Sequence, residues 1–128
     1  MKKFLTLLLA GGLLTLGATT LAAETAPKTI IHVVTVAWKA EATPAQIQAA
    51  LDGVQALPAS FPGIIHVWTK AIKIQDAPGA EIKKANVFVM EFADEAAFQS
   101  YTDSPAQKEW YKVYLPIRRQ STTFDITN

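Results

Sequence analysis

Two segments of this chain have the composition of β-strands and carry apolar side chains at both odd and even positions. Residues 29–39 read TIIHVVTVAWK, and residues 85–92 read ANVFVMEF. β-Branched and aromatic residues favour a strand. Alternate side chains of a strand point to opposite faces of its sheet, so a strand that is apolar at both positions is buried on both faces. A fold for this chain must therefore remove two faces of one sheet from water.

Two helical regions are predicted between the strands. The first begins at Thr43, which is followed by a proline at the first helical position and forms a capping box with Gln46, and Pro58 is expected to end it. The second is broken in two, because Asp94 caps one helix and Ser104 caps another. The buried side of the last helix is expected to comprise residues at helical spacing: Trp110, Tyr111, Tyr114, Leu115 and Ile117.

Residues 64–75 and 121–128 are predicted to be the remaining strands. The element order is then β-α-β-β-α-β, which is the ferredoxin-like pattern of an α+β fold with one four-stranded antiparallel sheet. Two crossover helical regions cover one face of such a sheet and leave the other. We expect a second copy of the chain to cover it, forming a homodimer. The alternative is that the outward apolar residues stay in contact with water.

Residues 1–23 read as a secretory signal peptide. Lys2 and Lys3 precede an uncharged apolar run from Phe4 to Leu16, and small residues follow up to Ala23. Cleavage within a residue of Ala23 would leave residues 24–128 as the domain. The protein is then expected to be exported, either to a periplasm or out of the cell, with no membrane attachment after cleavage. The alternative is an uncleaved membrane anchor.

Several classes of function are excluded or disfavoured by composition. The chain has no cysteine, so it forms no disulfide, thiolate metal site or cysteine nucleophile. Its 12 basic and 11 acidic residues give no reason to expect a nucleic-acid partner. His32 and His66 fall on strands that are not neighbours in this fold, which argues against a metal site. No phosphate-binding loop or nucleotide fingerprint is present, so no cofactor is expected.

The opening strand, Phe61-Pro62-Gly63, the strand NVFVMEF and the stretch AFQSYTDSPAQKEWYKVYLP together resemble the stress-responsive A/B barrel (Dabb) family. The resemblance covers about residues 29–127. It implies a dimeric α+β barrel in which two small ferredoxin-like domains pair. Antibiotic-biosynthesis monooxygenases share this architecture but fit these pieces less well.

The resemblance also implies site residues in a cavity between the helices and the sheet. A plant polyketide cyclase of the family uses two histidines there, with tyrosines lining the cavity. His32 matches the first-strand histidine and Tyr101 matches a cavity tyrosine, whereas Gln107 stands where the second histidine would be. An amide is no general base near neutral pH, so whether the chain is an enzyme is left open.

Each candidate also has a structural interpretation. His32 could be a core histidine, and Gln107 could be the capping-box residue of the helix that begins at Ser104. Tyr101 could pack with its hydroxyl at the rim, and Trp110 could belong to the core or an interface rather than to a ligand site. Arg118 and its neighbour Arg119 are expected to be solvated.

Three hypotheses follow for the function. The first is a protein that binds a small apolar or aromatic molecule through His32, Tyr101, Gln107 and Trp110, or that has a structural role in stress response. The second is a cyclase- or monooxygenase-like enzyme with His32 and Tyr101 as catalytic residues. The third is an interaction module with a filled core and no cavity beside these residues.

Overall fold

The computed structural model of this chain describes residues 28–72 and 84–127. The predicted signal peptide and residues 73–75 of the strand predicted at 64–75 lie outside the described residues. The elements follow in the order β1 (Ile30–Trp38), α1 (Pro44–Gln55), α2 (Leu57–Ser60), β2 (Ile64–Ala71), β3 (Asn86–Phe92), α3 (Glu95–Tyr101), α4 (Pro105–Tyr114) and β4 (Arg118–Ile126).

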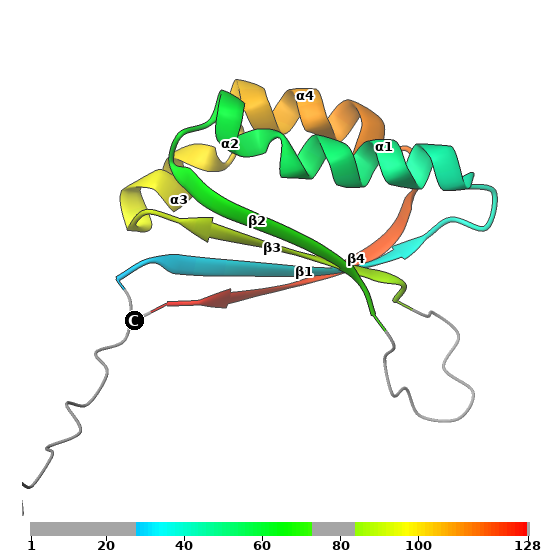
Figure 1. Cartoon of the computed structure of the whole chain (residues 1–128), viewed down its shortest axis with the longest axis horizontal. Helices are drawn as coiled ribbons and strands as arrows, with labels where there is room; N and C mark the ends of the chain where they lie inside the picture. The colour runs from blue at the N-terminus through cyan, green and yellow to red at the C-terminus, as the bar shows by residue number, and fades with distance from the viewer. Residues whose placement is uncertain (1–27, 73–83, 128) are drawn as a thin grey trace, which may run out of the picture.

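The four strands form one antiparallel sheet in the order β2-β3-β1-β4, and the helices lie over one of its faces (Figure 1). This arrangement confirms the predicted α+β, ferredoxin-like fold. The doubly apolar strands β1 and β3 occupy the two central positions, where neighbours on both sides satisfy their backbone groups. Strand β4 begins at Arg118, three residues earlier than predicted, and within the described residues β2 ends at Ala71 rather than at 75.

The predicted helix starts are present with their caps. The Thr43 hydroxyl accepts from the backbone N–H of Gln46, whose side chain returns to Thr43, and the side chains of Asp94 and Ser104 accept from backbone N–H groups in their own helices. The predicted end of the first helix at Pro58 is wrong. Helix α1 stops at Gln55, and Pro58 lies near the start of the short helix α2, where a missing N–H costs nothing.

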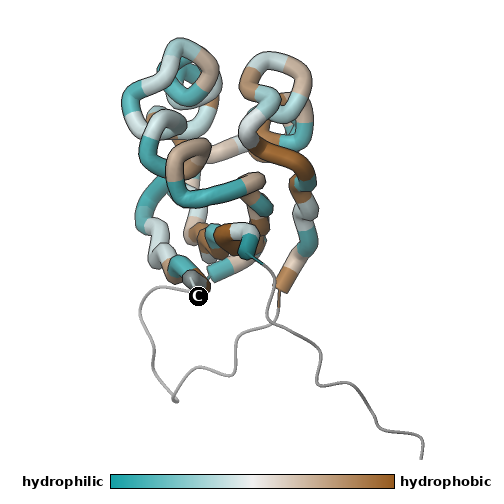
Figure 2. The backbone as a smooth tube through the Cα atoms, turned by 90° about the vertical axis from the view of Figure 1, so that its left-hand side faces the viewer, coloured by the Kyte–Doolittle hydropathy of each residue, from teal (hydrophilic) through white to brown (hydrophobic). Residues whose placement is uncertain are grey.

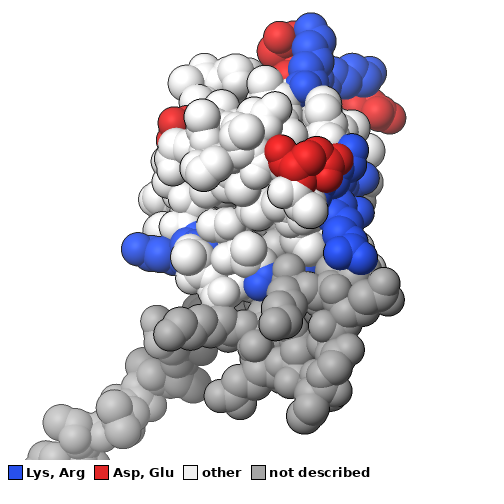
Figure 3. Space-filling model, turned by 90° about the vertical axis from the view of Figure 1, so that its right-hand side faces the viewer, with Lys and Arg blue, Asp and Glu red and all other residues white. Residues whose placement is uncertain are grey.

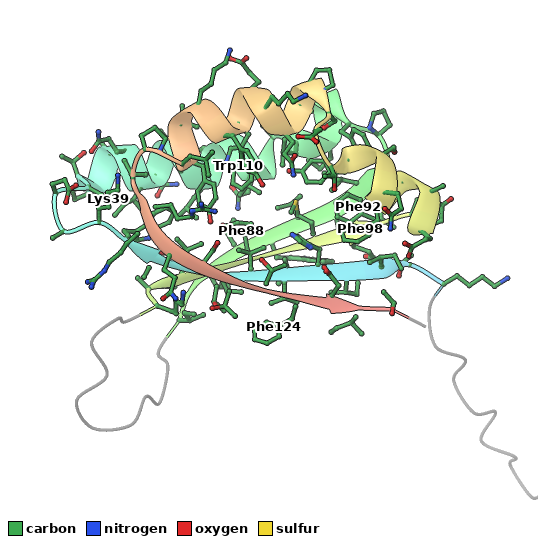
Figure 4. All side chains as sticks on the ribbon, turned by 180° about the vertical axis from the view of Figure 1, so that it is seen from behind. Lys39, Phe88, Phe92, Phe98, Trp110 and Phe124 are labelled. Atoms are coloured by element: carbon green, nitrogen blue, oxygen red, sulfur yellow. The ribbon has the colours of Figure 1, made fainter. Side chains whose placement is uncertain are left out.

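The core lies between the helices and the sheet. Phe88, Phe92, Phe98 and Trp110 fill this layer, whereas Phe124 points away from the helices on the other side of the sheet (Figure 4). Leu115, which was predicted to be buried, is 39% exposed. It follows Tyr114 by one residue, and one residue turns the side chain about 100° away from the buried stripe of the helix.

The face of the sheet opposite the helices is called the open face here. Strand register places three rows of side chains across it: His66, Glu91, Ile31 and Ile126; then Trp68, Val89, Val33 and Phe124; then Lys70, Val87, Thr35 and Thr122. Figure 2 shows the helices above and the strands below, with hydrophobic segments in the strands. Trp68, Phe124 and Ile126 are 46%, 56% and 59% exposed. The open face is therefore an apolar surface without cover from the described part of the chain.

Charged side chains of both signs lie beside one another on the surface. In Figure 3 blue and red groups lie side by side at the top and along the right side, and the centre and left of this view are mostly uncharged. Among the described residues, no helix is long and apolar enough to cross a membrane.

Candidate active site in a helix–sheet cavity

A cavity of about 150 Å³ lies between the sheet and helices α3 and α4. Its lining combines aromatic rings with a few polar side chains: His32, Val34, Phe88, Met90, Phe98, Tyr101, Thr102, Gln107, Trp110, Tyr111, Tyr114, Arg118, Ser121 and Thr123. The four residues proposed from the sequence to bind a ligand, His32, Tyr101, Gln107 and Trp110, all line it. Within the described residues the core is therefore not completely filled.

The imidazole of His32 is oriented by Asp125. Strand β1 pairs with β4 so that these two residues are direct cross-strand partners, and Nδ1 of His32 lies 2.5 Å from Oδ1 of Asp125. An ionised carboxylate only accepts, so Nδ1 carries the hydrogen and donates it. A neutral imidazole held in this way presents Nε2 as an acceptor, which is the form that a general base requires.

Sequence reasoning did not single out Asp125. The residue lies 93 positions from His32 in the chain. The pairing of β1 with β4 and its register bring the two together, and neither is visible as a local pattern. A carboxylate inside a predicted strand was the only available signal, and the apolar residues Phe124 and Ile126 of that strand have the opposite parity.

The Tyr101 hydroxyl is buried at the cavity and has no hydrogen-bond partner among the described residues. Its ring packs against Phe61 and Phe92, with centroids 5.5 and 5.2 Å away. The hydroxyl is therefore not at an exposed rim. Burial raises the pKa of Tyr101 well above its ordinary value, and the nearby Tyr111 adds to the effect. The phenol therefore remains protonated at neutral pH, and its O–H group can donate a hydrogen bond that it does not make within the described residues.

All three tyrosines of the chain line this cavity. Burial also raises the pKa values of Tyr111 and Tyr114. The Tyr114 hydroxyl is buried beside Ser121 and Arg118, and hydrogen bonding to these two side chains and the charge of Arg118 partly oppose the rise of its pKa. The cavity thus contains one buried phenol hydroxyl, that of Tyr101, that makes no hydrogen bond within the described residues.

Gln107 lines the cavity and also forms hydrogen bonds that hold the local backbone. Its Oε1 accepts from the backbone N–H of Asp103 at 2.8 Å, and its own backbone N–H donates to the Ser104 hydroxyl at 3.2 Å. Asp103 has a φ of 63°, which is rare for a residue with a side chain. The amide oxygen of Gln107 is therefore used to hold the step between α3 and α4.

Trp110 contributes its ring to the cavity while its polar atom is used elsewhere. The indole Nε1–H donates to the carbonyl oxygen of Ala50 on α1 at 2.9 Å. The ring stacks on Tyr114 with centroids 4.5 Å apart and planes 10° apart, and meets Phe88 edge-on. Trp110 fixes α4 against α1 and offers an aromatic surface to the cavity.

Arg118 was expected to be solvated, and this expectation is wrong. It is half-buried and lines the cavity, with Nη1 donating to the Ser121 hydroxyl at 3.3 Å. Its guanidinium carbon lies 5.5 Å from the centre of the Tyr114 ring. The strand begins earlier than predicted, and this brings Arg118 inside the fold.

His66 lies on the open face, away from His32, and the strands β1 and β2 that carry the two histidines are separated by β3. Its Nδ1 lies 2.9 Å from Oε2 of Glu91, and its ring stacks on Trp68. In the described part of the chain, no three His, Asp or Glu side chains are grouped as metal ligands would be.

The sequence also matches a described protein family. The match is to the "Stress responsive A/B Barrel Domain", and it extends over residues 30–128. The chain belongs to this family. Resemblance in the strands and in the step into the last helix had predicted the same family.

Solved structures of similar fold include a member of this family and proteins of unknown function. A Dabb family protein with a ferredoxin-like fold from Mesorhizobium loti is 22% identical, with a TM-score of 0.61 over 78% of this chain and 96% of that one. A dimeric ferredoxin-like protein of unknown function from Thermobifida fusca is 20% identical, with a TM-score of 0.63 over 80% of this chain and 92% of that one.

Hydroxynitrile lyase from Passiflora edulis is similar as well. It is 17% identical, with a TM-score of 0.65 over 79% of this chain and 94% of that chain. At these identities the likeness concerns the fold. No protein with a curated description matches the sequence.

Proposed function

We propose that this A/B barrel protein is an exported homodimer that binds a small aromatic or apolar molecule in the cavity between its helices and its sheet. One observation carries the proposal: the buried hydroxyl of Tyr101 has no partner among the described residues, and it faces a cavity beside the oriented imidazole of His32. Pockets that bind small molecules combine an apolar lining with a few convergent polar groups in this way.

The energetics of the Tyr101 hydroxyl support a ligand. A buried hydroxyl without a hydrogen bond costs about 1–3 kcal/mol. A ligand that accepts from Tyr101 regains part of this cost on binding. Rings of Trp110, Phe88 and Phe98 provide the remaining contacts, which suit a flat aromatic molecule.

The open face supports the homodimer. Its central row contains Trp68, Val89, Val33 and Phe124, and exposed apolar surfaces of this kind mark interfaces. The similar protein from Thermobifida fusca is described as dimeric. A twofold pair of open faces would bury the second face of the sheet, as the doubly apolar strands require.

Export rests on the first 23 residues. Two lysines, an uncharged apolar run and small residues at its end are the three parts of a secretory signal. Expression of the full chain in a bacterium with a periplasm should yield a product in the periplasmic or extracellular fraction. Its mass should correspond to cleavage within a residue of Ala23, and a full-length product in the membrane fraction would favour the anchor instead.

A thermal-shift screen tests ligand binding. The purified protein is heated with a set of single-ring aromatic and short acyl compounds, together with a Tyr101→Phe variant that removes one unpartnered hydroxyl. A ligand at 100 times its dissociation constant stabilises the folded state by about 2.7 kcal/mol. We expect a subset of aromatic compounds to raise the unfolding temperature of the natural protein and to do so less for the variant. No stabilisation by any compound would contradict the proposal.

A second candidate is catalysis, favoured by the contact between His32 and Asp125. A carboxylate that fixes the imidazole and supports its protonated form is a recurring feature of general bases. A cyclase- or monooxygenase-like enzyme would use His32 as the base and Tyr101 as a proton donor. The presence of a hydroxynitrile lyase with this fold adds a carbon–carbon lyase to the possibilities.

Incubation of each stabilising compound with the protein, followed by mass spectrometry, tests this candidate. His32→Ala should abolish product formation while the variant still unfolds cooperatively at a similar temperature. If His32→Ala unfolds the protein, His32→Gln provides a second variant of similar size with no basic nitrogen. Product formation that survives in a folded variant would exclude His32 as the base.

A further inference from the structure

Arg118 gives the cavity a cationic end. It is the only lysine or arginine among the described lining residues, and its guanidinium contacts the Tyr114 ring and the Ser121 hydroxyl. No carboxylate pairs with Arg118 among the residues that the structure describes. A half-buried guanidinium with donors to spare is an anion site, because its planar fork matches the two oxygens of a carboxylate.

The carboxylate in the same strand, that of Asp125, already forms a hydrogen bond with another side chain. Asp125 is bound to His32 at the far end of β4, seven residues along the chain from Arg118. The cavity is therefore polarised along β4, with a cation near Ser121 and an acceptor, Nε2 of His32, at the other end.

The register gives the separation along the strands between the backbone levels of the two ends. The guanidinium reaches the level of Ser121, which pairs with Val36, and the imidazole lies at the level of Asp125, which pairs with His32. Four strand residues correspond to about 13 Å. Hydrogen bonds of about 2.8 Å at each end leave room for one six-membered ring with polar groups at opposite positions.

The volume of the cavity indicates a ligand of the same size. A cavity of about 150 Å³ is one that accommodates a benzene-sized molecule. The walls between the two polar ends are the aromatic rings of Phe88, Trp110 and Tyr114. The site thus fits a single aromatic ring.

We infer that the ligand is a single-ring aromatic carboxylate whose carboxylate binds the Arg118 guanidinium and whose ring hydroxyl, at the opposite position, donates to Nε2 of His32. This inference rests on the proposed function, since it specifies the ligand of the same cavity. It makes Arg118 the residue that selects an acid over a neutral aromatic molecule of equal shape.

Calorimetric titration with 4-hydroxybenzoate, and with the uncharged 4-hydroxybenzamide of nearly equal shape, tests the inference. Both are titrated into the protein purified after expression of the full chain, and into Arg118→Gln. The control variant is Arg119→Gln, which removes a positive charge from the adjacent residue that does not line the cavity. Thermal unfolding of each variant checks that it is folded.

A hydrogen bond to a charged group contributes about 1.5–3 kcal/mol, which corresponds to roughly a 10- to 100-fold change in affinity. We expect the acid to bind the natural protein more tightly than the amide by this factor. Arg118→Gln should reduce the affinity for the acid to the level of the amide and leave the amide nearly unchanged, whereas Arg119→Gln should change neither. Arg118→Lys, which keeps the charge but loses the fork, should give an intermediate affinity for the acid.

Equal affinities for acid and amide in the natural protein, or an unchanged affinity for the acid in Arg118→Gln, would overturn the inference while the proposed function stands. Failure of the acid, the amide and phenol alike, together with no stabilisation by any compound of the thermal-shift screen, would overturn both. Benzoate tests the other end of the cavity. It should bind about tenfold more weakly than 4-hydroxybenzoate, because the bond to His32 is lost. Equal affinity for the two acids would remove His32 from the assignment.

Discussion

At the scale of single residues, the cavity contains a buried polar group that lowers the stability of the folded protein. Tyr101 buries a hydroxyl without a partner among the described residues, and His32 and Arg118 line the same cavity. A buried hydroxyl without a hydrogen bond is uncommon in a core that is selected only for packing. Its place beside His32 and Arg118 is the residue-level argument that this region binds a ligand.

Replacement of Tyr101 by phenylalanine should separate stability from binding. Tyr101→Phe keeps the ring contacts with Phe61 and Phe92 and removes the unpartnered hydroxyl. We expect the ligand-free protein to gain about 1 kcal/mol in unfolding free energy, and ligand binding to weaken. Urea unfolding with and without a stabilising aromatic compound measures both. A loss of stability in the ligand-free variant would show that the hydroxyl is satisfied in the folded protein, for example by water.

The buried tyrosines also predict a loss of stability at alkaline pH. The pKa of Tyr101 is raised in the folded state, whereas an unfolded tyrosine ionises near pH 10. Above that pH the folded protein binds more protons than the unfolded chain, so its stability falls as the pH rises. The contribution of Tyr101 is at most about 1.4 kcal/mol for each pH unit above 10.

Tyrosinate absorbance offers a direct measurement, because every tyrosine of the chain lines the cavity. We expect little tyrosinate in the folded protein at pH 10 and its abrupt appearance on unfolding. In Tyr101→Phe the decline of stability with pH should be shallower. Ordinary titration of all the tyrosines near pH 10 in the folded protein would mean that the cavity is open to water.

At the scale of the elements, the packing of α1 against α4 sets the position of the aromatic wall. Gly53 on α1 lies directly against the Trp110 ring, and a Cβ at this position would be 2.9 Å from Cδ1 of Trp110. The ring has little freedom to move, because its Nε1 is bonded to Ala50 and its face is stacked on Tyr114. Glycine is needed here for close approach.

Gly53→Ala tests this packing. Alanine is favoured over glycine in a helix by about 1 kcal/mol, but overpacking costs about 1–3 kcal/mol. We expect a net loss of stability and a changed fluorescence or near-ultraviolet circular dichroism signal from Trp110. Ala49→Gly, at an exposed position of the same helix, measures the helix propensity alone and should cost about 1 kcal/mol. A gain of about that size in Gly53→Ala would show that the ring yields.

At the scale of the whole molecule, the two faces of the sheet differ in whether helices cover them. The helices cover one face and form the cavity, while the open face carries Trp68 and Phe124 in its central row. A standard interface buries about 800 Å² of each partner, and apolar area of this kind is its main driving force. The proposed dimer would therefore complete the fold without touching the cavity from the helical side.

A charge on the open face should separate the subunits. Trp68→Glu places a carboxylate at the proposed interface, and burial of an unpaired charge is costly. We expect its dimer dissociation constant to rise by about 100-fold or more, which is about 2.8 kcal/mol. Val113→Glu is the matched control, because Val113 lies on the helical side and is 45% exposed, against 46% for Trp68.

Sedimentation at low micromolar concentration measures the effect. The natural protein and Val113→Glu should sediment as dimers and Trp68→Glu as a folded monomer. A natural protein that is monomeric and does not aggregate at this concentration would contradict the dimer. It would also show that the apolar open face is tolerated in water.

Much of the fold was already determined by local sequence patterns. Some features depend on neighbouring residues and on short-range sterics, so they can be read from the chain. They are the apolar side chains at both odd and even positions of β1 and β3, the capping residues Thr43, Asp94 and Ser104, and the order of the elements. The residues His32, Tyr101, Gln107 and Trp110 were found through a family resemblance that rests on the same short patterns. The misjudged positions, Pro58 and Leu115, depend on where a helix ends, and this is decided by packing.

Only the tertiary structure decided which polar groups meet. Asp125 reaches His32, and Arg118 enters the cavity, because antiparallel pairing of β4 with β1 fixes a register between segments that are far apart in sequence. Whether a tyrosine hydroxyl finds a partner likewise depends on every element packed around it. A sequence records the short-range preferences that build strands and helices. The contacts that make a site arise from long-range geometry, in which each element is placed by all the others.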